Sequence, residues 1–316
     1  MHTAHTPTSN EHRGDPTHCI AGCRSSGALN DTDAQASLGV EAVVVAFGAP
    51  ELLAECLTVL GSEIPVTVVD NSSDQRVRTI SQEHGAHYVD PGRNLGFAAG
   101  VNLGLARRQR PDYDVLLVNP DATVTLQCVS ALDQCLHRRV DLACAAPAQI
   151  DPTGTEPARV GWPFPTPLGA WVEAIGLGRI RGSRDFMIGS VLLIRAKALS
   201  EVGELDEQFF LYAEETDWQR RAHDLGWKMA FCPEATATHI GAGTGGDSQQ
   251  RSLHFHASQE RYIRKHHGSA GWQIYRWGMM AGALLRSLIL PGPRGRSAAF
   301  RFHLYRQGPC MVESGR

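Results

Sequence analysis

Short apolar runs alternate with segments of helical periodicity over the first half of the chain. Residues 41–47, 66–70 and 114–119 are hydrophobic at nearly every position and rich in valine, which is typical of strands buried on both faces of a sheet. Residues 50–60 and 97–108 repeat apolar positions at helical spacing. Strands that alternate with helices in this way predict a mostly parallel sheet with right-handed crossovers. Further helices are expected at 74–84 and 125–138, and a short strand at 87–89.

The second half of the chain is less regular. Residues 151–183 are rich in proline and glycine and are expected to form a long loop over a ligand crevice, with a short helix near 168–175. A buried strand is predicted at 186–194. The remaining expected elements are a helix at 214–225, short strands at 228–232 and 236–240, and a basic helix at 248–267.

Polar residues stand directly at the carboxyl ends of two of the predicted strands. Asp70 and Asn71 stand at the end of one strand, and Asn119 and Asp121 at the end of another. Ligands of open α/β sheets bind beyond the carboxyl ends of the strands, so both clusters are expected to face one crevice. A carboxylate at position 70 is suited to accept a hydrogen bond from the N–H of a uracil-type or thymine-type base. The alternative is an ordinary turn acid before a helix capped by Ser73.

Asp121 is suited to hold a hard cation, because the proline before it and the helix after it fix its carboxylate at the strand end. Such a cation stabilises the charge that develops on a leaving nucleoside diphosphate. An ordinary turn before the next helix is the alternative. His239 ends the last short strand, and the glycine-rich stretch 241–246 behind it is suited to a lid that closes over a ligand. An isolated histidine is otherwise more often structural.

The stretch 92–102 combines small residues with Arg93 and Asn94. Small side chains let a helix approach the sheet or a ligand closely, and Arg93 is suited to neutralise a phosphate. The glycine spacing is not that of a dinucleotide-binding loop. Taken alone, this stretch favours close packing of a helix on the sheet.

Three carboxylates, Glu214, Glu215 and Asp217, stand at the start of a predicted helix. The helix dipole favours acids there, so a solvated helix end is one explanation. The apolar run 209–212 that precedes them predicts instead that they are anchored against the domain. A carboxylate held in this way can act as a general base.

Composition narrows the function. The 316 residues include 42% hydrophobic residues, enough for a sizeable core, and a formal net charge of −3 argues against a nucleic-acid partner.

The eight cysteines are expected to be free thiols, since Cys19 and Cys23 lack the second pair that a zinc site requires. Residues 1–38 show little apolar periodicity and are expected to be a disordered tail. Because no secretory signal is recognisable, we expect the protein in the cytoplasm.

The C-terminal part is basic, with no Asp or Glu between residues 261 and 311. Its apolar run 277–290 contains Arg286 and is shorter than the roughly 20 residues that a membrane span requires. Two interpretations remain open for this segment. It forms either a helix packed on the catalytic domain or a helix that lies in the membrane interface, with aromatic anchors and flanking arginines.

Taken in order, these residues resemble the family 2 inverting glycosyltransferases of the GT-A fold, and most closely the bacterial rhamnosyltransferase branch, over about residues 41–278. The most specific part extends from Gly189 and Ser190 to Trp227 and contains GSVLLIR, then DEQFFLY and then EETD. The resemblance implies an α/β GT-A fold with a Rossmann-like, mostly parallel sheet flanked by helices, and a helical C-terminal extension. It further implies a dTDP- or UDP-sugar donor and a divalent metal, Mg²⁺ or Mn²⁺.

The resemblance also assigns roles. It implies that Asp121 and His239 bind the metal and that the catalytic base lies in the pair Glu214-Glu215, of which we favour Glu215. Asp70 is expected at the nucleobase. The residues expected to bind the donor are Asp70, Asn71, Arg93, Asn94, Asn119, Gly189, Ser190 and Asp217.

Finally, the resemblance implies a transferase domain at 39–267 and a basic amphipathic extension at 268–316. The expected sugar is L-rhamnose from dTDP-rhamnose, and the expected acceptor is a lipid-linked or cell-envelope glycan at the inner face of the membrane. A soluble small-molecule acceptor is the alternative. Three features depart from the family pattern. Asn119 replaces the first acid of Asp-x-Asp, the pair Glu214-Glu215 stands where many relatives have Glu-Asp, and Phe47-Gly48-Ala49 stands where a polar pair is common.

Two other functions are consistent with an α/β nucleotide-binding sheet. A nucleotidylyltransferase requires a basic phosphate loop after its first strand, and residues 46–50 contain no cation. A non-catalytic nucleotide-sugar-binding protein has no use for a base, so the retained carboxylates argue against it.

Overall fold

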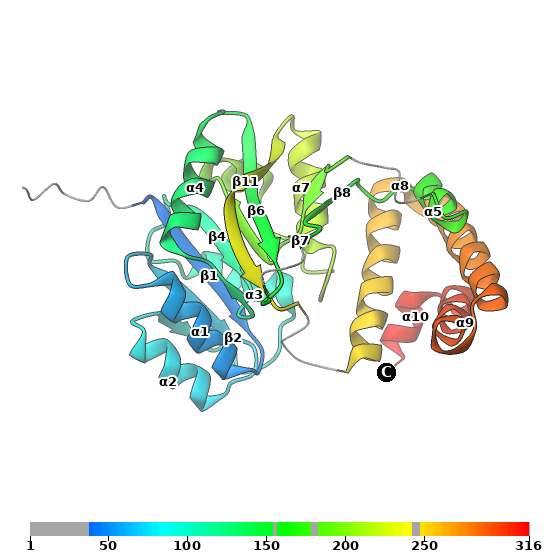
Figure 1. Cartoon of the computed structure of the whole chain (residues 1–316), viewed down its shortest axis with the longest axis horizontal. Helices are drawn as coiled ribbons and strands as arrows, with labels where there is room; N and C mark the ends of the chain where they lie inside the picture. Colours follow the sequence, from blue (N-terminus) through cyan, green and yellow to red (C-terminus); the bar gives the residue numbers. More distant parts are fainter. Residues whose placement is uncertain (1–37, 154–156, 178–182, 242–246, 316) are drawn as a thin grey trace, which may run out of the picture. The chain divides into compact units, whose positions relative to one another are not determined.

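The computed structural model describes residues 38–153, 157–177, 183–241 and 247–315 (Figure 1). Outside these ranges lie almost all of the predicted N-terminal tail, Cys19 and Cys23, and most of the glycine-rich stretch that follows His239. The other six cysteines are free thiols, as expected.

A nine-stranded sheet forms the centre of the described part. Its strands are β1 (Val40–Ala46), β2 (Val66–Asp70), β3 (His87–Val89), β4 (Asp114–Val118), β5 (Ala122–Thr123), β6 (Leu142–Ile150), β7 (Pro157–Ala158), β10 (Val191–Ile194) and β11 (Lys228–His239). They lie in the order β3-β2-β1-β4-β10-β6-β11-β5, and β7 pairs with β6. Only β5, β7 and β10 run against the other six strands, so the mostly parallel sheet is confirmed.

The strand predicted at 186–194 is divided in two. Its first part, β9 (Phe186–Met187), pairs with β8 (Gly161–Trp162) in a separate two-stranded sheet, and only its second part, β10, joins the central sheet. The chain leaves β6 at the carboxyl edge and enters β10 from that same edge. For this reason β10 runs antiparallel to both of its neighbours.

Helices cover both faces of the central sheet and bury its apolar side chains. The helices α1 (Pro50–Leu60), α2 (Gln75–Glu83) and α4 (Leu126–His137) share one hydrophobic core with the sheet. The other face packs against α3 (Phe97–Ala106), α6 (Ala196–Val202) and α7 (Glu214–Asp224). The helices predicted on these two faces are confirmed to within two residues, but α6 was not predicted, and α2 is capped by Asp74, not by Ser73.

The C-terminal part is helical, as expected. It consists of α8 (Ser248–Ile289), α9 (Gly292–Gln307) and α10 (Pro309–Ser314), and a third core of buried aromatic residues, including Trp272 and Tyr305, joins α8 to α9. The helix predicted to end at His267 continues as α8 beyond a single non-helical residue, Gly268, at φ 67°. Among the described residues, no helix combines the length and apolar character that a membrane span requires.

The short helix expected near 168–175 is confirmed as α5 (Pro167–Ala174). It packs along α8 (Figure 1), and no described residue of 151–183 is among those that line the crevice, so the expected position over the crevice is not observed. Glycines on α8 permit this close approach, because a Cβ atom at Gly278 would lie 3.0 Å from the Trp171 ring and one at Gly282 would lie 2.8 Å from the Ala174 main chain.

Candidate active site

A pocket of about 330 Å³ opens at the carboxyl edge of the sheet. Asn71 and Asn119 stand in its wall at the ends of β2 and β4, so the structure brings the two predicted polar clusters into one crevice. The pocket is lined by Val45, Phe47, Asn71, Asn94, Gly96, Phe97, Asn119, Pro120, Phe210, Leu211, Tyr212, His239, Gln250, Arg251 and His254.

Asp121 and His239 come together at this edge because β11 pairs antiparallel with β5. His239 is the register partner of Ala122, and the main-chain N–H of Ile240 donates to the carbonyl oxygen of Asp121 over 3.1 Å. The Nε2 atom of His239 lies 3.3 Å from Oδ1 of Asp121, whose carboxylate is buried. A carboxylate oxygen and an imidazole nitrogen at this separation can ligate one divalent cation, and the donor set suits Mn²⁺.

Asp70 is buried, and both of its carboxylate oxygens stabilise the turn after β2. Oδ1 accepts hydrogen bonds from the amide and hydroxyl of Ser72, and Oδ2 accepts from the amide of Asp74 and the hydroxyl of Tyr88. Asp70 therefore fixes the start of α2 and is not among the residues that line the pocket.

Asn71 provides a polar group in the wall next to Asp70. Its Nδ2 donates to the carbonyl oxygen of Gly96 over 2.9 Å, and its Oδ1 is buried without a hydrogen-bond partner among the described residues. Asn94 accepts from the amide of Gly96 and also lines the pocket. Arg93 is exposed and stands outside the lining.

Gly189 and Ser190 lie in the turn between β9 and β10, and they contact both the end of β4 and the start of α7. The carbonyl oxygen of Ser190 accepts from the amide of Asn119 over 2.8 Å, while its hydroxyl is buried against Gln149. A Cβ atom at Gly189 would lie 3.3 Å from Cβ of Glu215. The glycine therefore permits the glutamate to pack directly against the strand-end loop.

Glu214 and Glu215 begin α7 after two residues with left-handed backbone, Tyr212 and Ala213, each at φ 69°. Such conformations are costly outside glycine and are concentrated at functional sites. The Oε2 atoms of both glutamates are buried without a hydrogen-bond partner among the described residues.

Burial has a large effect on both acids. It raises the pKa of Glu215 to about 7, although main-chain amides, including that of Gly189, oppose the shift. Burial, and then the charge of Glu215, raise the pKa of Glu214 well above its ordinary value. A carboxyl group with a pKa near neutrality is suited to general-base chemistry, because it is substantially ionised yet still basic.

The phenol of Tyr212 responds to the charges of both glutamates and of Asp121. Burial raises the pKa of its phenol, the charge of Arg251 opposes this rise, and the carboxylates of Glu214, Asp121 and Glu215 add to it. All three carboxylates are therefore within electrostatic reach of Tyr212, which lines the pocket, although none of the three is itself among the lining residues.

Asp217, one turn further along α7, has a different environment. Its buried carboxylate accepts from Arg221, from Lys265 and from Nε2 of His266, at 2.9, 2.7 and 2.8 Å. Burial alone would raise the pKa of Asp217, but these contacts outweigh it and lower the pKa to about 2. Asp217 thus fastens α7 to α8, and it is not among the residues that line the pocket.

Residues 41–203 match the protein family Glycosyl transferase family 2, which is more than half of the chain. The chain belongs to this family. A rhamnosyltransferase from Mycobacterium tuberculosis, named N-acetylglucosaminyl-diphospho-decaprenol L-rhamnosyltransferase, is 28% identical over 263 residues, covering 73% of this chain and 85% of the relative. The hexosyltransferase Agl10 of low-salt glycan biosynthesis in Haloferax volcanii is 26% identical over 209 residues, and that match spans 66% of its length and 62% of this chain.

Solved structures show the same fold. The mannosyltransferase PcManGT from Pyrobaculum calidifontis, in complex with GDP-Man and Mn²⁺, superposes with a TM-score of 0.54 at 12% identity, covering 87% of this chain and 84% of its own. Mannosyl-3-phosphoglycerate synthase from Rubrobacter xylanophilus gives 0.51 at 13% identity, covering 72% and 74%. The GT-A fold is therefore confirmed for this family 2 glycosyltransferase, as is its enzyme class.

Part of the pocket wall of this glycosyltransferase comes from helix α8, which supplies Gln250, Arg251 and His254. Nδ1 of His254 lies 2.7 Å from a carboxylate oxygen of Glu313 in α10, so the last helix orients a pocket residue. The sequence indicated only a basic helix here. No local signal showed that the helix returns to the crevice.

Asp114, Asp133 and His137 form another group of the kind that can hold a metal. Asp114 begins β4, at the edge of the sheet opposite to the pocket, and its Oδ1 accepts from the amide of Ala196. This group is therefore separate from the donor site of the glycosyltransferase.

Proposed function

We propose that the protein transfers L-rhamnose from dTDP-rhamnose, with inversion, onto a hydroxyl of a lipid-linked glycan. The observation that carries this proposal is that Glu214 and Glu215 lie within electrostatic reach of the same side chain as Asp121, which is close to His239. The pKa of Glu215 is raised to about 7, as suits a base, and the carboxylate of Asp121 and the imidazole of His239 are suited to hold a cation. The name of the mycobacterial relative supports the choice of sugar and acceptor.

The donor occupies the pocket at the carboxyl edge. Asn71, Asn94 and Asn119 line it with amides that can bond to the base and sugar, and Phe47 offers an apolar surface beside them. Asp121 and His239 hold Mg²⁺ or Mn²⁺. When bound, the cation stabilises negative charge on the departing diphosphate.

Glu215 acts as the base. Its carboxylate takes the proton of the acceptor hydroxyl as that oxygen bonds to the anomeric carbon, and the bond from this carbon to the diphosphate breaks on the opposite side. One displacement inverts the anomeric configuration and leaves Glu215 protonated. Glu214 stays uncharged beside it, because two buried carboxylates do not readily ionise together.

We divide the chain into a transferase domain at 39–267 and a basic extension at 268–316 that contacts the inner face of the membrane. Arginines surround exposed hydrophobic residues of α8 and α9, including Trp277 and Phe300. Aromatic anchors with flanking basic residues are typical of helices that lie in the interface. Such contact brings the crevice to a lipid-linked acceptor.

A donor panel tests the proposal. The purified protein is incubated with Mn²⁺ or Mg²⁺ and with dTDP-rhamnose, UDP-hexoses or GDP-mannose, and donor hydrolysis and melting temperature are measured. We expect dTDP-rhamnose to give the largest rise in melting temperature and the fastest hydrolysis. Preference for another donor would overturn the choice of sugar, and no response to any donor would favour a non-catalytic homologue. Transfer to a soluble sugar but not to a polyprenyl-linked one would favour a soluble acceptor.

A further inference from the structure

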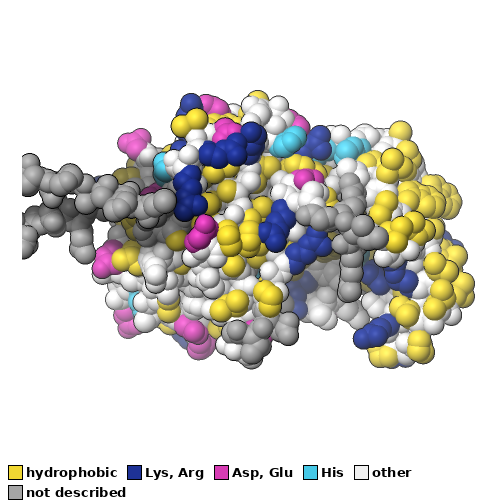
Figure 2. All heavy atoms as spheres, turned by 45° about the horizontal axis from the view of Figure 1, so that its top comes forward, with side chains coloured by type: hydrophobic (Ala, Val, Ile, Leu, Met, Phe, Trp, Pro, Cys, Tyr) yellow, Lys and Arg dark blue, Asp and Glu magenta, His cyan; other side chains and the backbone are white. Residues whose placement is uncertain are grey.

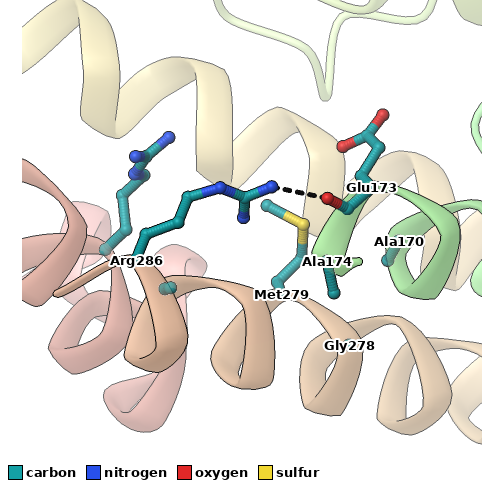
Figure 3. A pocket seen from close by; sticks show the side chains of 8 residues that line it. Ala170, Glu173, Ala174, Gly278, Met279 and Arg286 are labelled. Carbon is teal, nitrogen blue, oxygen red and sulfur yellow. Dashed lines mark hydrogen bonds between the residues drawn. The ribbon is translucent and has the colours of Figure 1, made fainter. Parts of the chain in front are cut away.

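A second pocket, of about 220 Å³, lies among the C-terminal helices, away from the donor site. Its floor is made by small and apolar residues of α5 and α8, among them Ala174, Gly278 and Met279 (Figure 3). Two arginines, Arg286 from α8 and Arg301 from α9, line it as well, together with one acid, Glu173 of α5, so the arginines outnumber the acids in the lining. A cavity that combines an apolar floor with two guanidinium groups fits an anion that carries an apolar tail.

Neither arginine forms an ion pair with a described carboxylate. Arg286 donates through Nη2 to the main-chain oxygen of Glu173 over 2.5 Å, the hydrogen bond drawn in Figure 3. The Nε atom of Arg301 is buried and has no hydrogen-bond partner among the described residues. Buried guanidinium nitrogens are rarely left unpaired, so the pocket has unused capacity for an anionic oxygen.

An exposed apolar face extends beside this pocket. On α8, hydrophobic residues recur at helical spacing on the solvent side, and Leu288 is 77% exposed and Trp277 60%. On α5, Leu168 and Ile175 are 70% and 67% exposed. Figure 2 shows hydrophobic side chains gathered over this region with Lys and Arg side chains next to them. Because α5 packs directly on the glycines of α8, the two helices present one continuous surface.

We infer that this pocket binds the phosphate of an anionic membrane lipid between Arg286 and Arg301, while the apolar face of α5 and α8 enters the bilayer interface. The inference rests on the proposed membrane contact and extends it to α5, which lies outside the C-terminal extension. Charge complementarity favours a lipid over a second copy of the chain. Residues 268–312 carry arginines and no acid, so a symmetric pairing of two such surfaces would oppose like charges.

The test is sedimentation of the full chain with vesicles of phosphatidylcholine, with and without phosphatidylglycerol, in the absence of sugar nucleotide. We expect binding to the vesicles that contain phosphatidylglycerol. The double variant Arg286→Gln/Arg301→Gln is expected to weaken this binding roughly 30-fold or more, because each basic residue near an anionic surface contributes and the pocket adds hydrogen bonds. Arg294→Gln/Arg296→Gln removes the same charge from α9 outside the pocket and is expected to lose less. Equal losses in both double variants would overturn the pocket.

The apolar face is tested separately with Ile175→Gln on α5 and Leu288→Gln on α8. Both are expected to weaken vesicle binding, whereas Val140→Gln, at an 86% exposed position before β6, is the matched control and is expected to bind normally. Unchanged binding by Ile175→Gln would overturn the role of α5. Self-association of the full chain that is lost in Leu288→Gln, without vesicle binding, would identify a second copy as the occupant. Donor hydrolysis measured without vesicles reports on the fold and on the proposed transferase function independently.

Discussion

The Nε2 atom of His239 lies 3.3 Å from Oδ1 of Asp121, across the antiparallel pairing of β11 with β5. If the two atoms share a cation, Asp121→Ala and His239→Ala each remove a ligand from it. Both variants are expected to weaken Mn²⁺-dependent binding of dTDP or UDP by at least roughly 10-fold, the loss that even an outer-shell partner of a metal site causes. Calorimetry with and without Mn²⁺ measures this. His137→Ala, in the acidic group at the opposite edge of the sheet, is the control and should bind normally. Unchanged affinity in both site variants would refute the assignment.

Glu215→Gln is expected to lower the rate of transfer by roughly 10²- to 10⁴-fold, because the acceptor hydroxyl loses its base. Affinity for the donor should stay nearly unchanged, since the diphosphate does not contact this side chain in the proposed arrangement. Glu214→Gln is the matched variant, with the same chemical change one residue earlier. An inactive Glu214→Gln together with an active Glu215→Gln would reverse the assignment, and activity in both would exclude general-base catalysis by this pair.

The raised pKa of Glu215 predicts how activity depends on pH. The base must be ionised, so the rate of transfer is expected to rise with pH through about 7 and then to level off. A rate that is flat between pH 6 and 8, at saturating donor and metal, would contradict the assignment. The measurement requires the chemical step to be rate-limiting, which a solvent isotope effect verifies.

The contribution of Glu215 to folding stability should fall with rising pH, whereas the rate of transfer should rise. The pKa of Glu215 is higher in the folded state than its ordinary value of 4.5, so the contribution of this group to folding is complete below that value and is lost as pH rises through about 7. Glu215→Gln removes the charge, and we expect it to raise the melting temperature at pH 8 but not at pH 4. The comparison is a pair of thermal melts at each pH. A variant that melts lower than the wild type at pH 8 would show that the ionised side chain is stabilised by contacts that the structure does not contain.

Asp217→Asn tests whether this acid is structural. The change removes the carboxylate that joins Arg221, Lys265 and His266, and we expect the free energy of unfolding to fall by about 3 kcal/mol, the low end for a broken buried pair, because the cations keep some contact with solvent. Denaturant titration measures the loss. Asp224→Asn, in an exposed pair on the same helix, should cost less than about 1 kcal/mol. Weaker donor binding at unchanged stability would instead support the donor-binding role first expected for Asp217.

The sequence predicted those parts of the fold whose signals are local. The strands at 41–47 and 66–70 are continuous apolar runs that end in turn residues, and such runs are typical of parallel strands that are buried on both faces of a sheet. The strand at 186–194 was predicted as one element because its apolar run continues past Gly189. Its division depends on the pairing of β9 with β8, which is a long-range contact.

The candidate site was also predicted only where local sequence signals were sufficient. The strand-end rule was enough to bring Asn71 and Asn119 to one pocket, whereas His239, which also lines it, was assigned to the site by the family resemblance. Residue type alone did not show which way a carboxylate points. Asp70 precedes the pocket residue Asn71 but accepts hydrogen bonds within its own turn, and Asp217 forms an ion pair with Lys265 of α8. Arg251 was not predicted as a site residue, because its position in the wall depends on where α8 packs.

The non-helical residue in α8 has a consequence for the choice of acceptor. Before Gly268, the helix is fastened to the transferase domain through Lys265 and His266, and after it the helix carries the apolar face. If the exposed hydrophobic residues after Gly268, among them Trp277 and Leu288, lie in the bilayer interface as proposed, the backbone angles of this glycine set the tilt of the crevice above the lipid headgroups. A fixed angle at this residue would hold the active site at one distance from the membrane surface. It would favour acceptors whose reactive hydroxyl lies at that distance over acceptors that carry the same sugar on a longer or shorter linkage.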